Sequence, residues 1–391
     1  MQVFSNKQTM STVFPIERFR AIPTPFYYYD LEVLRSTLAT IKKNQDKYGY
    51  KVHYALKANA NPVLLAEIRK AGLGIDCVSG NEVKCAVENG FDPAKIVFAG
   101  VGKSDWEIEY SLSAGISCFN VESIPEMEVI NELAANMGKV ADIALRINPN
   151  VDAHTHHYIT TGLEENKFGI GLWQLESVID RISELDNVNL IGLHFHIGSQ
   201  ILDNGPFQAL CNRINDLQRT LDRKKVCIKS INVGGGLGVD YVRPDENPVP
   251  EFDSYFATID KFLELRPGQE VHFELGRSVV CQCGSLITKV LYVKEGQKKK
   301  FAIVDAGMND LIRPALYQAS HKIENITSSE AEEPYDVVGP VCESSDCFGK
   351  EITLPSAKRG DLFAMRSAGA YGEIMAMRYN LRDLAKSYFS E

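Results

Sequence analysis

Seven of eight short apolar runs in the first three quarters of the chain end on residues that could do chemistry. In chain order these ends carry Lys57, Ser79, Glu122, Arg146, His196, the triplet Gly234-Gly235-Gly236, Glu274 and Arg277. Amine, imidazole, carboxylate and guanidinium groups can serve as nucleophile, acid, base and anion holder. We therefore expect these side chains to form one polar rim, in which no single member decides the chemistry.

Lys57 closes the apolar run 52–56 and admits two interpretations. A lysine at the mouth of a packed barrel can lose its charge by desolvation and become a nucleophile. A lysine at a strand end can also simply extend its ammonium group into solvent. For one lysine taken alone, the sequence favours the second interpretation.

The glycine triplet and Glu274 together indicate a ligand with two kinds of polar group. Three glycines let a backbone approach an anion closely, and loops after the seventh and eighth strands of a barrel often hold phosphate. A flexible turn is the alternative for the triplet, and a surface pair with Arg277 is the alternative for Glu274. A phosphate beside a carboxylate matches pyridoxal phosphate, whose protonated ring nitrogen a carboxylate stabilises.

The apolar runs alternate with helical patterns, which predicts an α/β fold. The runs cover residues 52–59, 74–79, 96–100, 118–123, 141–150, 190–199, 230–236 and 271–277. Asn61-Pro62 and the spacing of Ser79 and Glu82 are typical of helix starts. A doubly wound open sheet would also alternate strands and helices. Eight units with polar ends favour a (β/α)8 TIM-like barrel.

The pattern changes after residue 278. Strand-like segments at 286–296, 300–307, 335–342 and 361–372 are separated by Gly-, Ser- and Glu-rich spacers. They predict a β-rich second domain, a sandwich or barrel, which the strand-like segment 24–30 is expected to join. Helical periodicity returns near Leu311 and in the final residues. We predict a barrel domain at 31–277 and a β-rich domain formed by 1–30 and 278–391.

Composition excludes several classes of protein. The 391 residues carry a net charge of −9, with 45% hydrophobic and 24% charged residues. These values argue against a disordered or collagen-like chain, and the acidic balance argues against a nucleic-acid partner. No apolar stretch approaches the roughly 18 residues of a membrane helix, and residues 1–20 lack a secretory signal. Nine irregularly spaced cysteines fit no disulfide framework, so we expect a soluble, cytoplasmic protein without a membrane partner.

Histidines offer a metal site as an alternative. His194 and His196 share one face of a strand, and His154, His156 and His157 form a second cluster in a polar loop. A zinc or binuclear metal site could use such residues. Because no regular spacing links the two groups, we expect no metal, and a histidine at the barrel mouth could instead stack on a cofactor ring.

Six motifs in order resemble one known family. They are 54–59 (YALKAN), 194–199 (HFHIGS), 234–236 (GGG), 274–277 (ELGR), 339–344 (GPVCES) and 368–372 (AGAYG). Together they resemble the diaminopimelate decarboxylase family, pyridoxal-phosphate enzymes of fold type III with an alanine-racemase-like barrel. The resemblance runs from about residue 24 to about 380, and the string 146–170 is typical of this decarboxylase. Leu275 departs from the family, which usually has proline there.

The resemblance implies roles for residues of the barrel half. Lys57 would hold the cofactor as an internal aldimine, His196 would stack on its ring, and Glu274 would pair with the pyridine nitrogen. The residues expected around the phosphate and the substrate are Ser199, Gly235, Gly236, Gly276 and Arg277, with Tyr371 closing the phosphate site.

The resemblance also implies how the substrate is bound. Arg277, Arg313 and Tyr317 would hold its distal carboxylate, with Tyr371 nearby, and Glu343 would accept its distal ammonium group. Cys342 would be the proton donor. In the family, the cysteine and the following glutamate come from the partner subunit, which implies a homodimer with shared active sites.

The implied reaction removes one carboxylate from meso-2,6-diaminopimelate to give L-lysine and carbon dioxide, the last step of lysine biosynthesis. A racemase of this fold would place a basic residue at the ring nitrogen, which Glu274 argues against. An ornithine- or arginine-type decarboxylase would find Arg313 repulsive, because its substrate has a cationic distal end. A non-catalytic homologue should have lost Lys57 or Cys342, and both are present.

Overall fold

The structure is a computed structural model that describes residues 14–151 and 167–391. The described residues divide into two compact units, which are considered separately below. One unit comprises 37–238 and 251–279, and the other comprises the described residues up to Ser36 together with 239–250 and 280–391. The segment 239–250 therefore groups with the second unit. The sequence placed it inside the barrel domain, whose limits at 31 and 277 stay a prediction.

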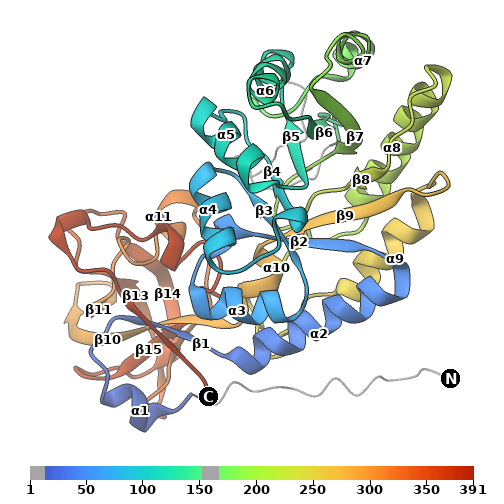
Figure 1. The fold of residues 1–391 in the computed structure, drawn as a ribbon. Coiled ribbons are helices and arrows are strands. Elements are labelled where there is room, and N and C mark those ends of the chain that lie inside the picture. The colour runs from blue at the N-terminus through green and yellow to red at the C-terminus, as the bar shows by residue number, and fades with distance from the viewer. Residues whose placement is uncertain (1–13, 152–166) are drawn as a thin grey trace, which may run out of the picture. The chain divides into compact units, whose positions relative to one another are not determined.

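The first unit is a closed barrel of parallel strands (Figure 1). Its strands are β2 (Lys51–Ala55), β3 (Gly74–Cys77), β4 (Ile96–Phe98), β5 (Cys118–Val121), β6 (Ala141–Arg146), β7 (Val188–His194), β8 (Ser230–Asn232) and β9 (Glu270–Leu275). Each strand pairs with the next, and β2 pairs with β9 so that His53 lies opposite Glu274. The predicted α/β barrel is confirmed, and the open sheet is not formed.

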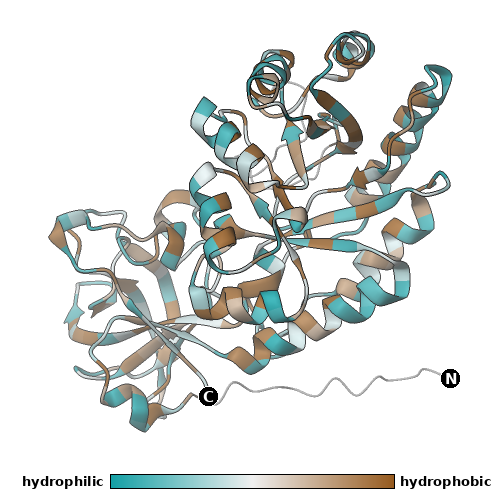
Figure 2. Ribbon diagram, in the orientation of Figure 1, coloured by the Kyte–Doolittle hydropathy of each residue, from teal (hydrophilic) through white to brown (hydrophobic). Residues whose placement is uncertain are grey.

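Helices alternate with the strands, beginning with α2 before β2, and each buries part of its surface. They are α2 (Leu31–Tyr48), α3 (Pro62–Lys70), α4 (Gly80–Glu88), α5 (Asp105–Ala114), α6 (Ile124–Asn136), α7 (Leu175–Ile182), α8 (Gly205–Arg223), α9 (Phe252–Phe262) and α10 (Arg277–Val280). Both predicted helix starts are confirmed, because the side chains of Asn61 and Ser79 accept the N–H groups of Val63 and Glu82. Figure 2 shows hydrophobic and hydrophilic residues alternating along α2 and α8, as expected for helices with one buried face.

The interior of this barrel is unusually polar. Bulky branched residues normally fill such an interior in layers. Here the buried residues of the strands include His53, Asp76, Asn120, His194 and Glu274. Because a buried polar group is costly unless it has a partner, these residues need one another or a ligand.

The second unit is built on an eight-stranded sheet. Its strands are β1 (Phe26–Tyr29), β10 (Gly284–Glu295), β11 (Lys300–Val304), β12 (Ile323–Asn325), β13 (Glu332–Val338), β14 (Cys347–Pro355), β15 (Leu362–Met365) and β16 (Lys386–Phe389). Two short helices, α1 (Ile16–Arg20) and α11 (Arg313–Tyr317), accompany the sheet. Its core includes Phe19, Phe26, Tyr28, Ile287 and Leu362. The predicted β-rich character is confirmed.

The helical interpretation of the final residues is wrong. Residues 386–389 form β16, which pairs in parallel with β1, and the ring of Tyr388 lies 5.3 Å from that of Phe26. An isolated helix of one or two turns is marginal in water, whereas strand pairing satisfies the same backbone groups and buries aromatic surface. In the described ranges, no helix combines the length and apolar character that crossing a membrane requires.

Candidate active site

The barrel brings its predicted residues to one rim. Lys57 lies in the short 3-10 helix η1 (Leu56–Ala58), directly after β2. His196 and Gly234 each follow the last residue of their strands, β7 and β8, by two positions, and Glu274 lies near the end of β9. Because the strands are parallel, all of these ends lie on the same face of the barrel.

Lys57 faces a buried carboxylate. Its Nζ lies 3.9 Å from Oδ2 of Asp76, and its side chain is 43% exposed. The ammonium group is therefore only partly shielded from solvent. Asp76 is almost fully buried, and its Oδ1 accepts no hydrogen bond. Burial and the nearby Glu274 raise the pKa of Asp76, while Lys57 opposes that shift.

Glu274 is held inside the barrel by three neutral side chains. Its Oε1 accepts hydrogen bonds from Nδ2 of Asn232 at 2.8 Å and of Asn120 at 2.9 Å. Its Oε2 lies 2.8 Å from Nε2 of His194, whose pKa burial lowers well below the usual value. Burial raises the pKa of Glu274, and Lys57 opposes this. In the described part of the chain, no lysine or arginine forms an ion pair with this carboxylate.

His196 and the glycine triplet are packed together. Nδ1 of His196 accepts the N–H of Gly235 at 3.2 Å, and burial lowers the pKa of His196, so the ring is neutral. A Cβ on Gly235 would lie 2.0 Å from the carbonyl oxygen of Glu274, and one on Gly234 would lie 2.2 Å from that of Phe195. The triplet is therefore a tightly packed segment rather than a flexible turn.

Arg277 begins α10 and binds Ser199. Its Nε and Nη2 donate to Oγ of Ser199 at 3.2 Å and 3.0 Å. Arg277 is buried, and Gly276 directly precedes it at the end of β9. The barrel thus brings a guanidinium group and a hydroxyl group together after two different strands.

Two other residues of the rim compensate each other. Nη1 of Arg146 lies 2.6 Å from Oε1 of Glu122, and both side chains are buried. Glu122 also accepts the N–H groups of Gly100 at 3.0 Å and Gly169 at 2.9 Å. Their charges and hydrogen-bonding capacity are used inside the barrel, which indicates a structural role.

Arg313 is the central cation of the second unit. Its Nη1 donates to Nε2 of His321 at 2.9 Å, and Nδ1 of His321 donates to the carbonyl oxygen of Arg366 at 2.8 Å. The guanidinium carbon lies 4.8 Å from the ring centroid of Tyr241. Arg313 is 6% exposed, yet among the described residues no carboxylate forms an ion pair with it. A buried cation without an anion is costly, so the arrangement suits an anionic ligand.

Cys342 and Glu343 lie in the loop between β13 and β14, and both are exposed. The backbone N–H of Cys342 donates to Oδ1 of Asn380 at 3.2 Å. The hydroxyl of Tyr379 donates to Oε1 of Glu343 at 2.6 Å. Thiol and carboxylate are thus presented at the surface of this unit.

Asp346 shapes the loop that carries Cys342. This buried carboxylate accepts the N–H groups of Val341 at 2.7 Å and Met308 at 2.6 Å. A Cβ on Gly339 would lie 2.3 Å from Oδ2 of Asp346, so the loop requires glycine there. Asp346 was not among the predicted residues.

The predicted site residues divide between the two units. The barrel holds Lys57, His196, Ser199, Gly235, Gly236, Glu274, Gly276 and Arg277, and the other unit holds Arg313, Tyr317, Cys342, Glu343 and Tyr371. Tyr317 is partly buried at the end of α11. Tyr371 has a left-handed backbone, with φ of 57°.

Sequence reasoning missed Asp76, Asn120 and Asn232. Each is a polar residue within a short apolar run, at a position that the strand alternation turns into the barrel. That single polar interruption is the signal that could have found them. His194 was considered for a metal, and the structure places it against Glu274 instead.

The ranges 14–151 and 167–391 contain no cluster of three or more His, Cys, Asp or Glu side chains that could hold a metal ion. His154, His156 and His157 lie outside the described residues.

Comparisons with known proteins identify the family of this chain. Residues 32–281 match the family model of the pyridoxal-dependent decarboxylase, pyridoxal binding domain. A diaminopimelate decarboxylase of Bacteroides thetaiotaomicron is 64% identical, over 98% of this chain and 99% of that protein. One from Neisseria meningitidis serogroup B is 42% identical, over 93% of this chain and 87% of that protein.

Solved structures show the same likeness. The diaminopimelate decarboxylase of Helicobacter pylori, complexed with L-lysine, has 41% identity and a TM-score of 0.91, covering 96% of this chain and 94% of that one. A lysine/ornithine decarboxylase of Vibrio vulnificus, at 22% identity and a TM-score of 0.83 over 96% of this chain and 97% of that one, shares the fold. The chain belongs to the diaminopimelate decarboxylase family of pyridoxal-dependent carboxy-lyases.

Proposed function

We propose that this chain converts meso-2,6-diaminopimelate to L-lysine and carbon dioxide, with the residue roles given below. The observation that carries the substrate assignment is Arg313, a buried guanidinium group whose described partners are all neutral. Such a group suits a substrate with a carboxylate at its far end. The Helicobacter pylori relative crystallised with L-lysine, the product of this reaction.

The barrel residues fit pyridoxal phosphate. Lys57 presents an amine at the rim, and Glu274 presents a buried carboxylate that no lysine or arginine neutralises within the described ranges. A side chain at Gly235 or Gly236 would clash with neighbouring backbone, so this segment requires glycine. Oδ1 of Asp76, buried without a hydrogen bond, has acceptor capacity to spare. Together they provide an amine, a carboxylate and a glycine-rich segment for the aldehyde, the ring nitrogen and the phosphate of the cofactor.

Each barrel residue then has a specific task. Bound pyridoxal phosphate supplies an electron sink for the pair that remains when a carboxylate leaves. Lys57 would hold the cofactor through Nζ, and Glu274 would keep a proton on the ring nitrogen. His196, neutral because burial lowers its pKa, would lie against the ring without adding a charge. The residues that would contact the phosphate are Ser199, Gly235, Gly236, Gly276, Arg277 and Tyr371.

The distal end of the substrate would be bound by charge. Arg313 would hold the distal carboxylate, together with Arg277, Tyr317 and Tyr371, and Glu343 would accept the distal ammonium group. His321 fixes the guanidinium group of Arg313 without neutralising it, because its Nε2 accepts while its Nδ1 donates. A charge-assisted bond to the substrate carboxylate is thereby left available. An ornithine-type substrate has no carboxylate at its distal end, so binding it would leave the charge of Arg313 unpaired.

Cys342 would deliver the proton that replaces the departing carboxylate, and it would do so in the active site of the partner subunit. The thiol and Glu343 are exposed on this chain, as residues that serve a second copy should be. This makes the enzyme a homodimer with shared active sites. All nine cysteines lie in the described ranges and none forms a disulfide, which supports a reducing, cytoplasmic location.

The decisive experiment measures carbon dioxide released from meso-diaminopimelate in the presence of pyridoxal phosphate, with L-ornithine as a parallel substrate. We expect release from diaminopimelate only. Release from ornithine only would refute the role of Arg313, and release from neither substrate would refute the catalytic assignment.

A second experiment tests the shared site. Lys57→Ala and Cys342→Ala variants are each expected to be inactive, and mixing them should restore about a quarter of the parent activity. Half of the reassorted dimers would then contain one intact site out of two. Absence of recovery after demonstrated subunit exchange would place both residues in the same subunit's site.

A further inference from the structure

The carboxylate of Glu274 accepts hydrogen bonds from side chains on three different strands of the barrel. Asn120 lies on β5, His194 on β7 and Asn232 on β8, and each contributes a hydrogen bond to the carboxylate on β9. All three side chains are buried, with 1% exposure for Asn120 and 5% for Asn232. The sequence assigned no role to either asparagine, and the proposed mechanism does not use them.

The hydrogen-bond pattern favours the ionised form of the Glu274 carboxylate and opposes the effect of burial on its pKa. An amide nitrogen can only donate, so Oε1 of Glu274 must accept twice. Nδ1 of His194 is buried without a partner. Burying an unprotonated ring nitrogen without a hydrogen-bond partner costs less free energy than burying an N–H group without one. The proton of His194 is therefore on Nε2, facing Oε2 of Glu274. A protonated Glu274 would have to turn its own O–H toward one of these donors.

Asn232 also connects the two parts of the proposed cofactor site. Its Oδ1 accepts the N–H of Gly234 at 2.9 Å, which fixes the amide so that Nδ2 points at Glu274. The backbone N–H of Glu274 in turn donates to the carbonyl oxygen of Gly234 at 2.9 Å. One amide therefore ties the glycine triplet, proposed for the phosphate, to the carboxylate proposed for the ring nitrogen.

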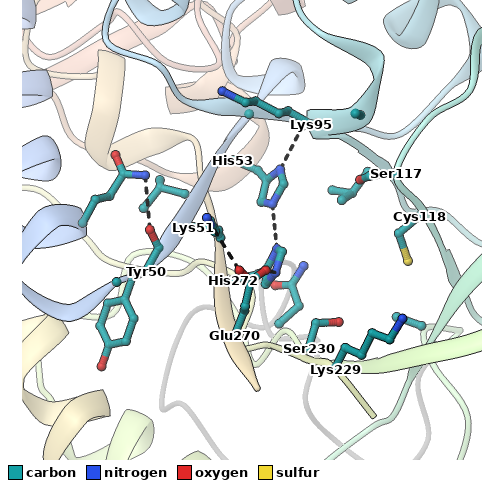
Figure 3. A pocket seen from close by; sticks show the side chains of 18 of the residues that line it. Tyr50, Lys51, His53, Lys95, Ser117, Cys118, Lys229, Ser230, Glu270 and His272 are labelled. Carbon is teal, nitrogen blue, oxygen red and sulfur yellow. Dashed lines mark hydrogen bonds and ion pairs between the residues drawn. The ribbon is translucent and has the colours of Figure 1, made fainter. Parts of the chain in front are cut away.

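Both asparagines face a cavity on their other side. A pocket of about 700 Å³, called here the N-terminal pocket, lies at the opposite end of the barrel strands. Its lining includes Lys51, His53, Asn120, Asn232, Glu270 and His272. Figure 3 shows His53 and His272 directed toward each other in this pocket. The two amides thus form part of the wall between the pocket and Glu274.

We infer that Asn232, assisted by Asn120, is a positioning residue that keeps Glu274 ionised and aligned with the glycine triplet, so that the carboxylate can hold a proton on the cofactor ring. This inference rests on the proposed role of Glu274. The other titratable or charged groups that act on Glu274 are His53, Asp76, Arg146, His194 and Lys57. None of them connects Glu274 to the glycine triplet.

Two variants of Asn232 distinguish a role in positioning Glu274 from a role in packing. Asn232→Asp keeps the shape of the wall but replaces the donor by a carboxyl group beside Glu274. Asn232→Ala removes the donor but opens Glu274 to water from the N-terminal pocket, and water can donate in its place. Positioning therefore predicts that Asp is worse than Ala, whereas a packing role predicts the reverse, because only Ala leaves a cavity.

The experiment uses the holoenzyme and three measurements: the dissociation constant of pyridoxal phosphate, the pH midpoint of the bound-cofactor absorbance, and kcat with KM for diaminopimelate. For Asn232→Asp we expect a cofactor dissociation constant and a kcat each worse by about a hundredfold, with a displaced pH midpoint and little change in KM. For Asn232→Ala we expect about tenfold. Asn120→Asp, which alters the same carboxylate oxygen from another strand, repeats the test if Asn232→Asp does not fold.

Asn215 provides the matched control. It is 4% exposed on α8, and among the described residues its side chain bonds only backbone groups, the carbonyl oxygen of Phe262 and the N–H of Glu264. Asn215→Asp should lower the melting temperature without moving the absorbance midpoint.

Two outcomes overturn the inference: an Asn232→Asp enzyme with parent-like absorbance and kcat, or an Asn232→Ala enzyme that is worse than Asn232→Asp. Glu274→Gln distinguishes this failure from that of the proposed function. If Glu274→Gln binds cofactor and turns over like the parent, the role of Glu274 itself is wrong. If Glu274→Gln fails and Asn232→Asp does not, only the positioning role is wrong.

Discussion

Each unit buries a charged side chain whose partners among the described residues are all neutral, and the two charges are opposite. In the barrel, Glu274 is an anion surrounded by two amides and a neutral imidazole. In the β-rich unit, Arg313 is a cation surrounded by an imidazole and an aromatic ring. In both places neutral partners fix the orientation of the group while leaving its charge in place.

Other buried charges in the same units are handled differently. In the barrel, Glu122 pairs with Arg146 at 2.6 Å. In the β-rich unit, Arg366 bonds Asp245 and Glu324, both at 2.7 Å. Removing a charge from water costs several kcal/mol, so a scaffold normally supplies the counter-charge. The difference separates charges that stabilise the fold from charges that a ligand is meant to neutralise.

Removing the lysine at the barrel rim should have the largest effect. In the Lys57→Ala enzyme, the absorbance of covalently bound cofactor should vanish, and activity should fall by at least about a thousandfold, because the amine has no substitute. Absorption spectroscopy and carbon dioxide release measure both effects. Lys51→Ala, an exposed lysine at the other end of β2, is the control, and equal loss in that variant would contradict the assignment.

Removing the uncompensated cation should damage substrate binding. For Arg313→Gln we expect KM for diaminopimelate to rise about ten- to a hundredfold, which corresponds to a lost charge-assisted hydrogen bond. The cofactor spectrum should stay unchanged, and discrimination against ornithine should shrink. Steady-state kinetics with both substrates test this. An unchanged KM would show that Arg313 is not a charge that the substrate neutralises.

Removing a compensated cation should damage the fold instead. Arg366→Gln would leave the carboxylates of Asp245 and Glu324 without this partner, and each is 28% exposed. We expect the free energy of unfolding to fall by about 2 kcal/mol, less than for a fully buried pair, with KM unchanged. Chemical denaturation measures the loss. If Arg366→Gln changed KM but left the free energy of unfolding at the parent value, the presence of a carboxylate partner would not explain the different roles of Arg366 and Arg313.

The neutral partner of Arg313 should have a smaller effect. His321→Leu removes the acceptor at Nε2, so the guanidinium group becomes free to turn away. We expect KM to rise about fivefold with kcat nearly constant, since one such bond is worth about 1 kcal/mol. His321→Gln, which keeps an acceptor, should recover most of the loss. Failure of Gln to recover it would indicate a packing role.

The histidine pair in the N-terminal pocket should give the smallest effect, visible as pH dependence. Burial lowers the pKa of both His53 and His272 to about 4 from 6.5. The unfolded chain therefore binds more protons below about pH 6.5, and stability is lost as the pH falls from there toward 4.

As the pH falls from about 7.5 to 6, each histidine should lower the free energy of unfolding by roughly 1 kcal/mol. His272→Gln should reduce that loss relative to the parent in urea denaturation at several pH values. Identical pH profiles for parent and variant would show that this pair is not buried in neutral form.

Much of the fold was predictable because it rests on local patterns. The eight strands from β2 to β9 lie in short, largely apolar runs, and Asn61 and Ser79 cap helices through bonds to their near neighbours. The last strand was not predictable. Residues 386–389 form a strand because their backbone pairs with β1, which lies more than 350 positions away in the chain.

The sequence by itself determined the alternation of strands and helices, the polar residues at the strand ends and the family motifs, because these depend on residue types and short spacings. Only the tertiary structure decided which polar groups meet. It pairs Glu122 with Arg146, leaves Glu274 and Arg313 with neutral partners, and adds Asp76, Asn120 and Asn232 to the site. Whether a buried charge is compensated depends on groups from other strands within a few ångströms, and that distance is set by the closure of the barrel and the sheet.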